Sequence, residues 1–390
     1  TSKWRSSLLN RMSHPPFAAF AMPRFDGAIL YGKGCLVIFI KSMQTIQTSN
    51  FRNSSVLHIV PSKSRVSSGM RWTEEFQNMR IIGPDELIFG VDNLEASRAF
   101  LVDYGLTDVG NDTFEALDGT AITLRARDDA SLPAALETGS MLRRTIWGVE
   151  DQASLDAIET ELSKDREIVK NDGQLLTKDD AGFEIGFQLT RRRPLDLPAE
   201  MINSPGAKPG RAPNEIAANE DAEAKPRSLS HIVYFVPDMD VMANFYIDRL
   251  QFVITDKFTN TGPFLRPQAN NDHHVLFMIQ TPPYMQGLEH LAFHMQGPTE
   301  LMLAGSRMVK KGYESFWGPG RHKFGSNWFW YFNSPLGTHV EYDADMDHHD
   351  GDWIHREGPM GPEQAQMFLF ENVEKWAPGG PPPGKGGKPE

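Results

Sequence analysis

The sequence of 390 residues is poor in cysteine, in long apolar runs and in positive charge. Its one cysteine, Cys35, excludes an intramolecular disulfide framework and indicates a reducing compartment, so we expect a cytoplasmic protein. The longest apolar run near the start, CLVIFI, is far shorter than the ~20 residues of a membrane helix. Lys and Arg number 39 against 51 Asp and Glu, and the net charge of −12 argues against a nucleic-acid partner.

Composition divides the chain into segments. Residues 1–72 hold ten Lys or Arg and one acidic residue, Asp26, without a lasting helical or strand period. Such a leader is typical of an organelle transit peptide or of a start that extends beyond the folded protein, and its Pro and Gly residues favour the second interpretation. A Pro-, Ala- and charge-rich stretch then indicates a linker, and a Gly- and Pro-rich end indicates a tail. We expect a leader at 1–77 that is disordered or outside the fold, domains at 78–192 and 228–376, a linker at 193–227 and a disordered tail at 377–390.

The two expected domains resemble each other. The segment ELIFGVDNLEASRAFLVDYGL from Glu86 matches HIVYFVPDMDVMANFYIDRLQF from His231 at an offset of 145 residues. In each, an apolar run precedes an Asp or Asn that can cap an amphipathic helix. A second such unit begins at Leu142 in one copy and at Leu288 in the other, where a helix follows Pro298. Strand, helix and several strands, repeated four times, predict an α+β fold.

Histidine is missing from the first copy. None of the twelve His lies between His58 and His231, and ten lie from His231 onward. His231, His290 and Glu341 fall at equivalent points of three strands that the repeat places side by side. Two imidazoles and one carboxylate form the facial triad that holds non-haem Fe(II), and Mn(II) suits the same donors. A strand His is commonly an ordinary core residue, but a carboxylate in an apolar strand is costly without a cation. The corresponding positions of the first copy, which lack these ligands, are Glu86, Thr145 and Gly186.

The second copy resembles a known family. The run GPGRHKFGSNWFWYFNSPLGTHVEY, the pair His273 and His274, and the strands LSHIVYFV and LEHLAFHM are similar to motifs of the type I extradiol ring-cleavage dioxygenases. These catechol 2,3-dioxygenase-like and 2,3-dihydroxybiphenyl 1,2-dioxygenase-like enzymes belong to the vicinal oxygen chelate superfamily. The resemblance covers residues ~80–360 in layout. It implies two tandem domains, each a pair of βαβββ modules of the glyoxalase-like fold, with an inactive first domain and an iron site in the second.

The resemblance also implies roles for individual residues. The three metal ligands would be those named above. His274 would be the catalytic base, while His322 and Tyr331 would act from the opposite wall and contact the substrate. Tyr331 and His322 precede Glu341 by ten and nineteen residues, as the family pattern requires. Apolar residues nearby predict a pocket for a one- or two-ring catechol, and the expected substrate-binding residues are His273, His322, Tyr331 and Phe293.

We therefore expect extradiol (meta) cleavage of a catechol-type diol by O2 in a homo-oligomeric enzyme of aromatic hydrocarbon catabolism, with neither nucleic acid nor membrane as a partner. Two alternatives stay open. One is another iron dioxygenase of the superfamily, resembling 4-hydroxyphenylpyruvate dioxygenase. The other is a non-catalytic small-molecule binding protein on the same fold. The His pair and the GRH run favour ring cleavage, and iron content would separate an enzyme from a binder.

Overall fold

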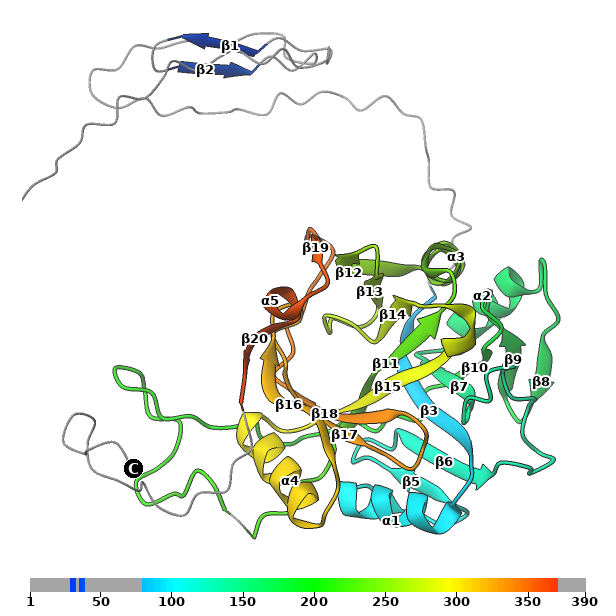
Figure 1. Cartoon of the computed structure of the whole chain (residues 1–390), viewed down its shortest axis with the longest axis horizontal. Helices are drawn as coiled ribbons and strands as arrows, with labels where there is room; N and C mark the ends of the chain where they lie inside the picture. Colours follow the sequence, from blue (N-terminus) through cyan, green and yellow to red (C-terminus); the bar gives the residue numbers. More distant parts are fainter. Residues whose placement is uncertain (1–28, 33–34, 39–78, 220, 371–390) are drawn as a thin grey trace, which may run out of the picture. The chain divides into compact units, whose positions relative to one another are not determined.

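A computed structural model describes residues 29–32, 35–38, 79–219 and 221–370 (Figure 1). The expected tail lies outside these residues, as does most of the expected leader. The chain divides into two compact units, Thr1–Arg71 and Trp72–Glu390. In the first unit, strand β1 (Ile29–Gly32) pairs antiparallel with β2 (Cys35–Ile38).

An eight-stranded mixed sheet forms the first half of the second unit. Its elements are β3 (Ile81–Val91), α1 (Leu94–Tyr104), β4 (Thr107–Asp108), β5 (Thr113–Glu115), β6 (Ala121–Ala126), β7 (Leu142–Val149), α2 (Gln152–Leu162), β8 (Val169–Asn171), β9 (Gln174–Lys178) and β10 (Glu184–Leu189). The strand order is β4-β5-β6-β3-β7-β10-β9-β8. The antiparallel pair β3/β7 joins two βαβββ modules, with β6 parallel to β3 and β10 parallel to β7.

The second half repeats this plan in a larger sheet. Its elements are β11 (Ser228–Val236), α3 (Met239–Asn244), the π-helical turn η1 (Phe245–Arg249), β12 (Phe252–Thr259), β13 (Gly262–Pro267), β14 (Leu276–Gln280), the 3₁₀ turn η2 (Pro283–Met285), β15 (Gly287–His294), α4 (Pro298–Lys310), β16 (Ser315–His322), β17 (Trp328–Asn333) and β18 (His339–Ala344). Here β11 and β15 are the antiparallel central pair, β14 is parallel to β11 and β18 is parallel to β15. Four βαβββ modules therefore follow one another, which is the expected α+β layout.

A C-terminal segment closes the second sheet. It consists of β19 (Arg356–Pro359), α5 (Pro362–Ala365) and β20 (Gln366–Leu369). Strand β19 pairs with β12 at one edge of the sheet, and β20 pairs with β16 at the other. Figure 1 shows α5 between these two contacts. The segment thus bridges both edges of the curved sheet, an arrangement that the repeat pattern does not predict because the first half has no counterpart.

Local sequence signals set the helix ends. The side chain of Asn93 accepts a hydrogen bond from the backbone N–H of Ala96 at the start of α1, and Asp238 caps α3 in the same way. Helix α4 begins at Pro298, where a missing N–H costs nothing. Beyond its end, Gly312 has φ 91°, a left-handed conformation that favours glycine. The caps and Pro298 confirm the expected helix starts.

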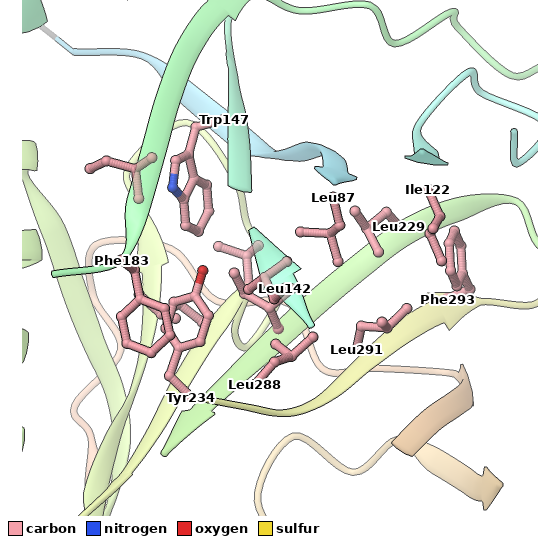
Figure 2. Packing of buried hydrophobic residues seen from close by; sticks show 14 of the residues in the cluster. Leu87, Ile122, Leu142, Trp147, Phe183, Leu229, Tyr234, Leu288, Leu291 and Phe293 are labelled. Atoms are coloured by element: carbon pink, nitrogen blue, oxygen red, sulfur yellow. The ribbon is translucent and has the colours of Figure 1, made fainter. Parts of the chain in front are cut away.

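The two sheets share one hydrophobic core. Figure 2 shows side chains of β3, β6 and β7 lying beside side chains of β11 and β15. Trp147 packs edge-on against Phe252 with ring centroids 5.6 Å apart, and Thr145 hydrogen-bonds the hydroxyl of Tyr234 at 2.6 Å. The first sheet therefore packs against the back of the strands that carry the candidate ligands. Among the residues that the structure describes, no helix has the length and apolar character to span a membrane.

Candidate metal centre and cavity

Three neighbouring strands bring the predicted ligands together. His231 lies on β11, His290 on β15 and Glu341 on β18. His290 Nε2 is 3.2 Å from His231 Nε2, and Glu341 Oε2 is 3.0 Å from His231 Nε2 and 3.3 Å from His290 Nε2. Among the described residues, these three form the one group of His, Cys, Asp and Glu close enough to share a metal ion. The sequence hypothesis thus corresponds to a single converging cluster.

The cluster fits a cation better than it fits a hydrogen-bond network. All three side chains are buried, and Glu341 is fully so. Its Oε1 atom has no hydrogen-bond partner among the described residues. Burial alone would raise the pKa of Glu341, but the charge of His231 and the hydrogen bonds from both imidazoles hold this pKa well below its usual range. A buried, ionised carboxylate beside two imidazoles is a donor set for a divalent metal.

Each imidazole is oriented by a second group behind it. His231 Nδ1 lies 2.9 Å from the hydroxyl of Ser230, which donates to Asp343 Oδ2 at 2.6 Å. His290 Nδ1 contacts the carboxylate of Glu289. Burial would raise the pKa of Glu289, but the neighbouring charge of His290 lowers it to about 2, so this carboxylate is ionised. Such outer hydrogen bonds fix ring orientation and turn Nε2 toward the metal position.

A mostly apolar cavity of about 310 Å³ opens over the cluster. Its lining includes His231 and His290, together with Glu289. No Lys or Arg belongs to the described lining. The apolar residues of the wall are Val233, Phe235, Phe258, Phe264, Phe277, Ile279, Phe316, Trp317, Phe324, Met360 and Ala365.

Three predicted polar rings line the same cavity: His274, His322 and Tyr331. The ring centroid of His274 is 4.2 Å from that of His231. Across the cavity, the hydroxyl of Tyr331 lies 3.2 Å from His322 Nε2. Tyr331 on β17 is the register partner of Glu341, which places the phenol beside the ligand cluster. The cavity therefore has an imidazole on one wall and an imidazole–phenol pair on the other.

Two other predicted substrate-binding residues do not reach the cavity. Phe293 is fully buried on the opposite face of β15, where it packs against Tyr104 with ring centroids 5.9 Å apart. Side chains alternate along a strand, so Phe293 and His290, three residues apart, point to opposite faces. His273 is fully buried behind His274 and is not part of the lining. The structure therefore does not bring either residue to the cavity with the other predicted site residues.

In the first sheet, other residues occupy the positions that correspond to the candidate ligands. The register partner of Ile88 is Arg144, just as that of Val233 is His290. Arg144, and not the expected Thr145, is therefore the position of the first sheet that corresponds to His290. The reason is that the offset between the copies grows by one residue before β7. At Gly186, an added Cβ would lie 2.6 Å from the Ile146 side chain. Apolar side chains fill this place in the first sheet.

Sequence reasoning missed several residues of the site. Asp343 lies two residues after Glu341 on β18, and Glu289 directly precedes His290. Acidic residues at these places are a detectable signal, since metal-bound imidazoles pair with carboxylates. Ser230, Trp317 and the residues of the closing segment carried no such signal, because their contacts depend on strands that are distant in sequence.

Comparisons with known proteins agree with this geometry. Residues 228–342 match the family model described as "Glyoxalase/Bleomycin resistance protein/Dioxygenase superfamily". This part of the chain is thus similar to that superfamily, in agreement with the resemblance seen in the sequence. Metapyrocatechase 2 of Cupriavidus necator is 32% identical over 151 residues, which make up 39% of this chain and 45% of that protein. The match therefore spans less than half of the curated relative's length.

Solved structures share the fold over most of the second unit. A Mn(II)-bound glyoxalase from Novosphingobium aromaticivorans has a TM-score of 0.57 at 23% identity, over 74% of this chain and 91% of its own. A halotolerant catechol dioxygenase has a TM-score of 0.57 at 15% identity, over 75% of this chain and 95% of its own. A catechol 2,3-dioxygenase has a TM-score of 0.55 at 17% identity, over 76% of this chain and 97% of its own. At these identities the likeness establishes the vicinal oxygen chelate fold.

Proposed function

We propose that this protein is an extradiol dioxygenase, which cleaves a catechol-type aromatic diol with O2 at a metal held by His231, His290 and Glu341. One observation carries the proposal: the three donors converge at an apolar cavity whose other polar lining includes an imidazole and an imidazole–phenol pair. The resemblance to metapyrocatechase and to catechol dioxygenases supports the same activity.

Fe(II) is the ion that we propose, since two imidazoles and one carboxylate are the donor set of non-haem iron dioxygenases. When bound, the ion supplies open coordination positions and a positive charge that lowers the pKa of a diol hydroxyl. Mn(II) accepts the same donors, and a Mn(II)-bound glyoxalase shares the fold.

The polar rings on the two walls of the cavity have different roles: one accepts a proton and the other donates a hydrogen bond. Burial lowers the pKa of His274 well below its usual value, so its imidazole is neutral and can accept a proton from a diol hydroxyl. On the other wall, burial and the charge of Glu341 raise the pKa of Tyr331 well above its usual value. Its phenol therefore keeps its proton and, beside His322, can donate a hydrogen bond to a substrate oxygen.

The walls favour uncharged substrates. Glu289, whose carboxylate lines the cavity, would repel a substrate carboxylate, and no described lining residue offers a compensating Lys or Arg. Phenyl rings of Phe258, Phe264 and Phe277 instead offer contact to an aromatic or alkyl substituent. We therefore propose a catechol with an apolar substituent as the preferred substrate class.

The test is a substrate panel with metal-loaded protein. Protein reconstituted anaerobically with Fe(II) is mixed in air with catechol, 3-methylcatechol, 2,3-dihydroxybiphenyl, 3,4-dihydroxyphenylacetate and 4-hydroxyphenylpyruvate. We expect O2 consumption and a yellow ring-opened product with the uncharged catechols, and slower turnover of the carboxylated one. Turnover of 4-hydroxyphenylpyruvate alone would indicate a different dioxygenase. Binding of catechols without stoichiometric metal or O2 consumption would indicate a non-catalytic binder.

A further inference from the structure

A chain of buried polar groups runs from the cavity wall to the closing segment. His274 Nδ1 lies 2.9 Å from His273 Nδ1, and His273 Nε2 lies 2.8 Å from Asp256 Oδ2. Asp256, on β12, is fully buried and is the register partner of Arg356 on β19. The backbone N–H of Arg356 donates to Asp256 Oδ1 at 2.7 Å, and its guanidinium donates to both carboxylate oxygens.

The hydrogen bonds in this chain fix the position of every proton. Burial would raise the pKa of Asp256, but hydrogen bonds from His273 and Arg356 lower it, so Asp256 is an ionised carboxylate that can only accept. His273 Nε2 must therefore carry a proton. Burial lowers the pKa of His273, which leaves its ring neutral and its Nδ1 as an acceptor. His274 Nδ1 must then carry the proton that it donates to His273.

The remaining nitrogen of His274 faces the cavity. Its Nδ1 is engaged by His273, which lies outside the cavity lining, and His274 itself belongs to that lining. Within the described residues, His274 Nε2 has no hydrogen-bond partner. With Nδ1 donating its proton to His273, the other ring nitrogen, Nε2, presents its lone pair at the cavity.

We propose that Asp256 and His273 are positioning residues that hold the proton of His274 on Nδ1 and present its unprotonated Nε2 to the substrate. The consequence for catalysis rests on the proposed function, whereas the tautomer does not. In the proton step, the O–H bond of a substrate hydroxyl breaks and an N–H bond forms at Nε2, with no electron transferred. The resulting imidazolium of His274 donates from both nitrogens, and the carboxylate of Asp256, two rings away, stabilises its charge.

Two substitutions at one position separate positioning from mere packing. His273→Phe keeps a ring in the space but removes the acceptor for His274 Nδ1. His273→Gln keeps an amide oxygen that can accept from His274 and an amide N–H that can donate to Asp256. If His273 is a positioning residue, His273→Gln should keep the tautomer of His274 and the turnover that His273→Phe loses. A purely structural role predicts the reverse order, since Phe preserves the ring and Gln does not.

The tautomer can be observed directly by nitrogen-15 NMR of histidine-labelled full-length protein. Zn(II), a diamagnetic ion that imidazole and carboxylate also bind, replaces iron in these samples. The signals of His274 are assigned by their loss in His274→Ala. We expect a protonated Nδ1 and a bare Nε2 in the parent protein and in His273→Gln, and loss of this preference in His273→Phe. A parent protein with the proton on Nε2 overturns the proposal, whether or not the variants fold.

Kinetics of the Fe(II)-loaded proteins supply the second readout. We expect His273→Phe to lower kcat by about 10²-fold, in the range of a positioned acid–base residue, with KM and metal content nearly unchanged. His273→Gln should recover most of that loss. A kcat for His273→Phe equal to that of the parent overturns the positioning role. A parent that shows the expected tautomer but cleaves no catechol overturns the proposed function and leaves the tautomer assignment intact.

Discussion

The hydroxyl of Tyr104, at the end of α1 in the first sheet's module, donates a hydrogen bond to the backbone carbonyl of Glu341 at 2.6 Å. In return, the hydroxyl of Tyr342 donates to the carbonyl of Tyr104 at 2.7 Å, and the two rings stack with centroids 4.0 Å apart. All three residues are buried. The half of the unit that lacks the candidate ligands thus holds the strand that carries Glu341.

Replacing Tyr104 with Phe should therefore weaken the fold around β18. The change keeps the stacked ring but leaves a buried carbonyl without this donor. We expect the free energy of unfolding to fall by about 1–3 kcal/mol, measured by denaturant titration. Metal should still bind, since the donor set is intact. Tyr284→Phe, whose hydroxyl is exposed, is the control. An unchanged stability for Tyr104→Phe would show that the contact between the sheets does not support β18.

Substitution of two cavity imidazoles should separate metal binding from chemistry. His290→Ala removes one of three donors, so iron and activity should be lost together. His274→Ala leaves the donor set whole, so iron should stay bound while turnover falls by about 10²–10⁴-fold. Metal analysis beside steady-state kinetics checks both. Loss of iron from His274→Ala would show that the ligand assignment is wrong.

Glu289 should influence metal affinity without binding the metal. Its carboxylate contacts His290 Nδ1 and lies 3.0 Å from His339 Nδ1. Glu289→Gln removes the charge that orients His290, and we expect metal affinity to fall by about 10–100-fold in a competition titration with a chelator. Glu314→Gln, an exposed residue that bonds Asn333, is the matched control. Equal affinities in the two variants would contradict the orienting role.

Asp179 should make stability depend on pH. It is buried, its Oδ1 accepts from the backbone N–H groups of Ala181 and Phe183, and burial raises its pKa to about 7. Between its unfolded pKa near 4 and this value, the native state binds one more proton than the unfolded state. The free energy of unfolding should therefore fall as pH rises from 4 to 7, by up to about 4 kcal/mol from this group.

Asp179→Asn cannot ionise and should remove this part of the slope. Its amide oxygen can still accept from both backbone donors. We expect the variant to match the parent near pH 4 and to be more stable at pH 8, with Asp196→Asn, an exposed site, leaving the slope in place. Identical pH profiles for the parent and Asp179→Asn would contradict a raised pKa.

The repeat indicated the candidate ligand set, and irregularities of the repeat limited the prediction of other residues. At the offset of 145 residues, Glu86 corresponds to His231. The offset between the copies lengthens before β7, so Arg144, and not the expected Thr145, corresponds to His290. Phe293 was assigned to the pocket from its apolar character, although strand alternation from His290 places it on the other face. His273 and His274 precede β14, so no strand period shows which of the two faces the cavity.

Contacts between distant segments lay beyond sequence reasoning. Asp256 and Arg356 meet because β12 pairs with β19, which the first copy lacks. Tyr104 and Glu341 meet because the two sheets pack through one core. Neither pairing follows from periodicity or spacing, since each depends on how whole modules dock. The closing segment and the hydrogen-bond chain behind His274 therefore required the structure.

The central claim is that both atoms of O2 enter a ring-opened catechol at the site of His231, His290 and Glu341. The most direct measurement is mass spectrometry of the product formed by Fe(II)-loaded protein from 2,3-dihydroxybiphenyl under oxygen-18 gas, with His290→Ala in parallel. We predict a ring-opened product made by the parent, with one label in its carboxylate and one in its ketone oxygen before exchange, and no product from the variant. Unlabelled product, intact substrate, or equal labelled product from His290→Ala would contradict the account.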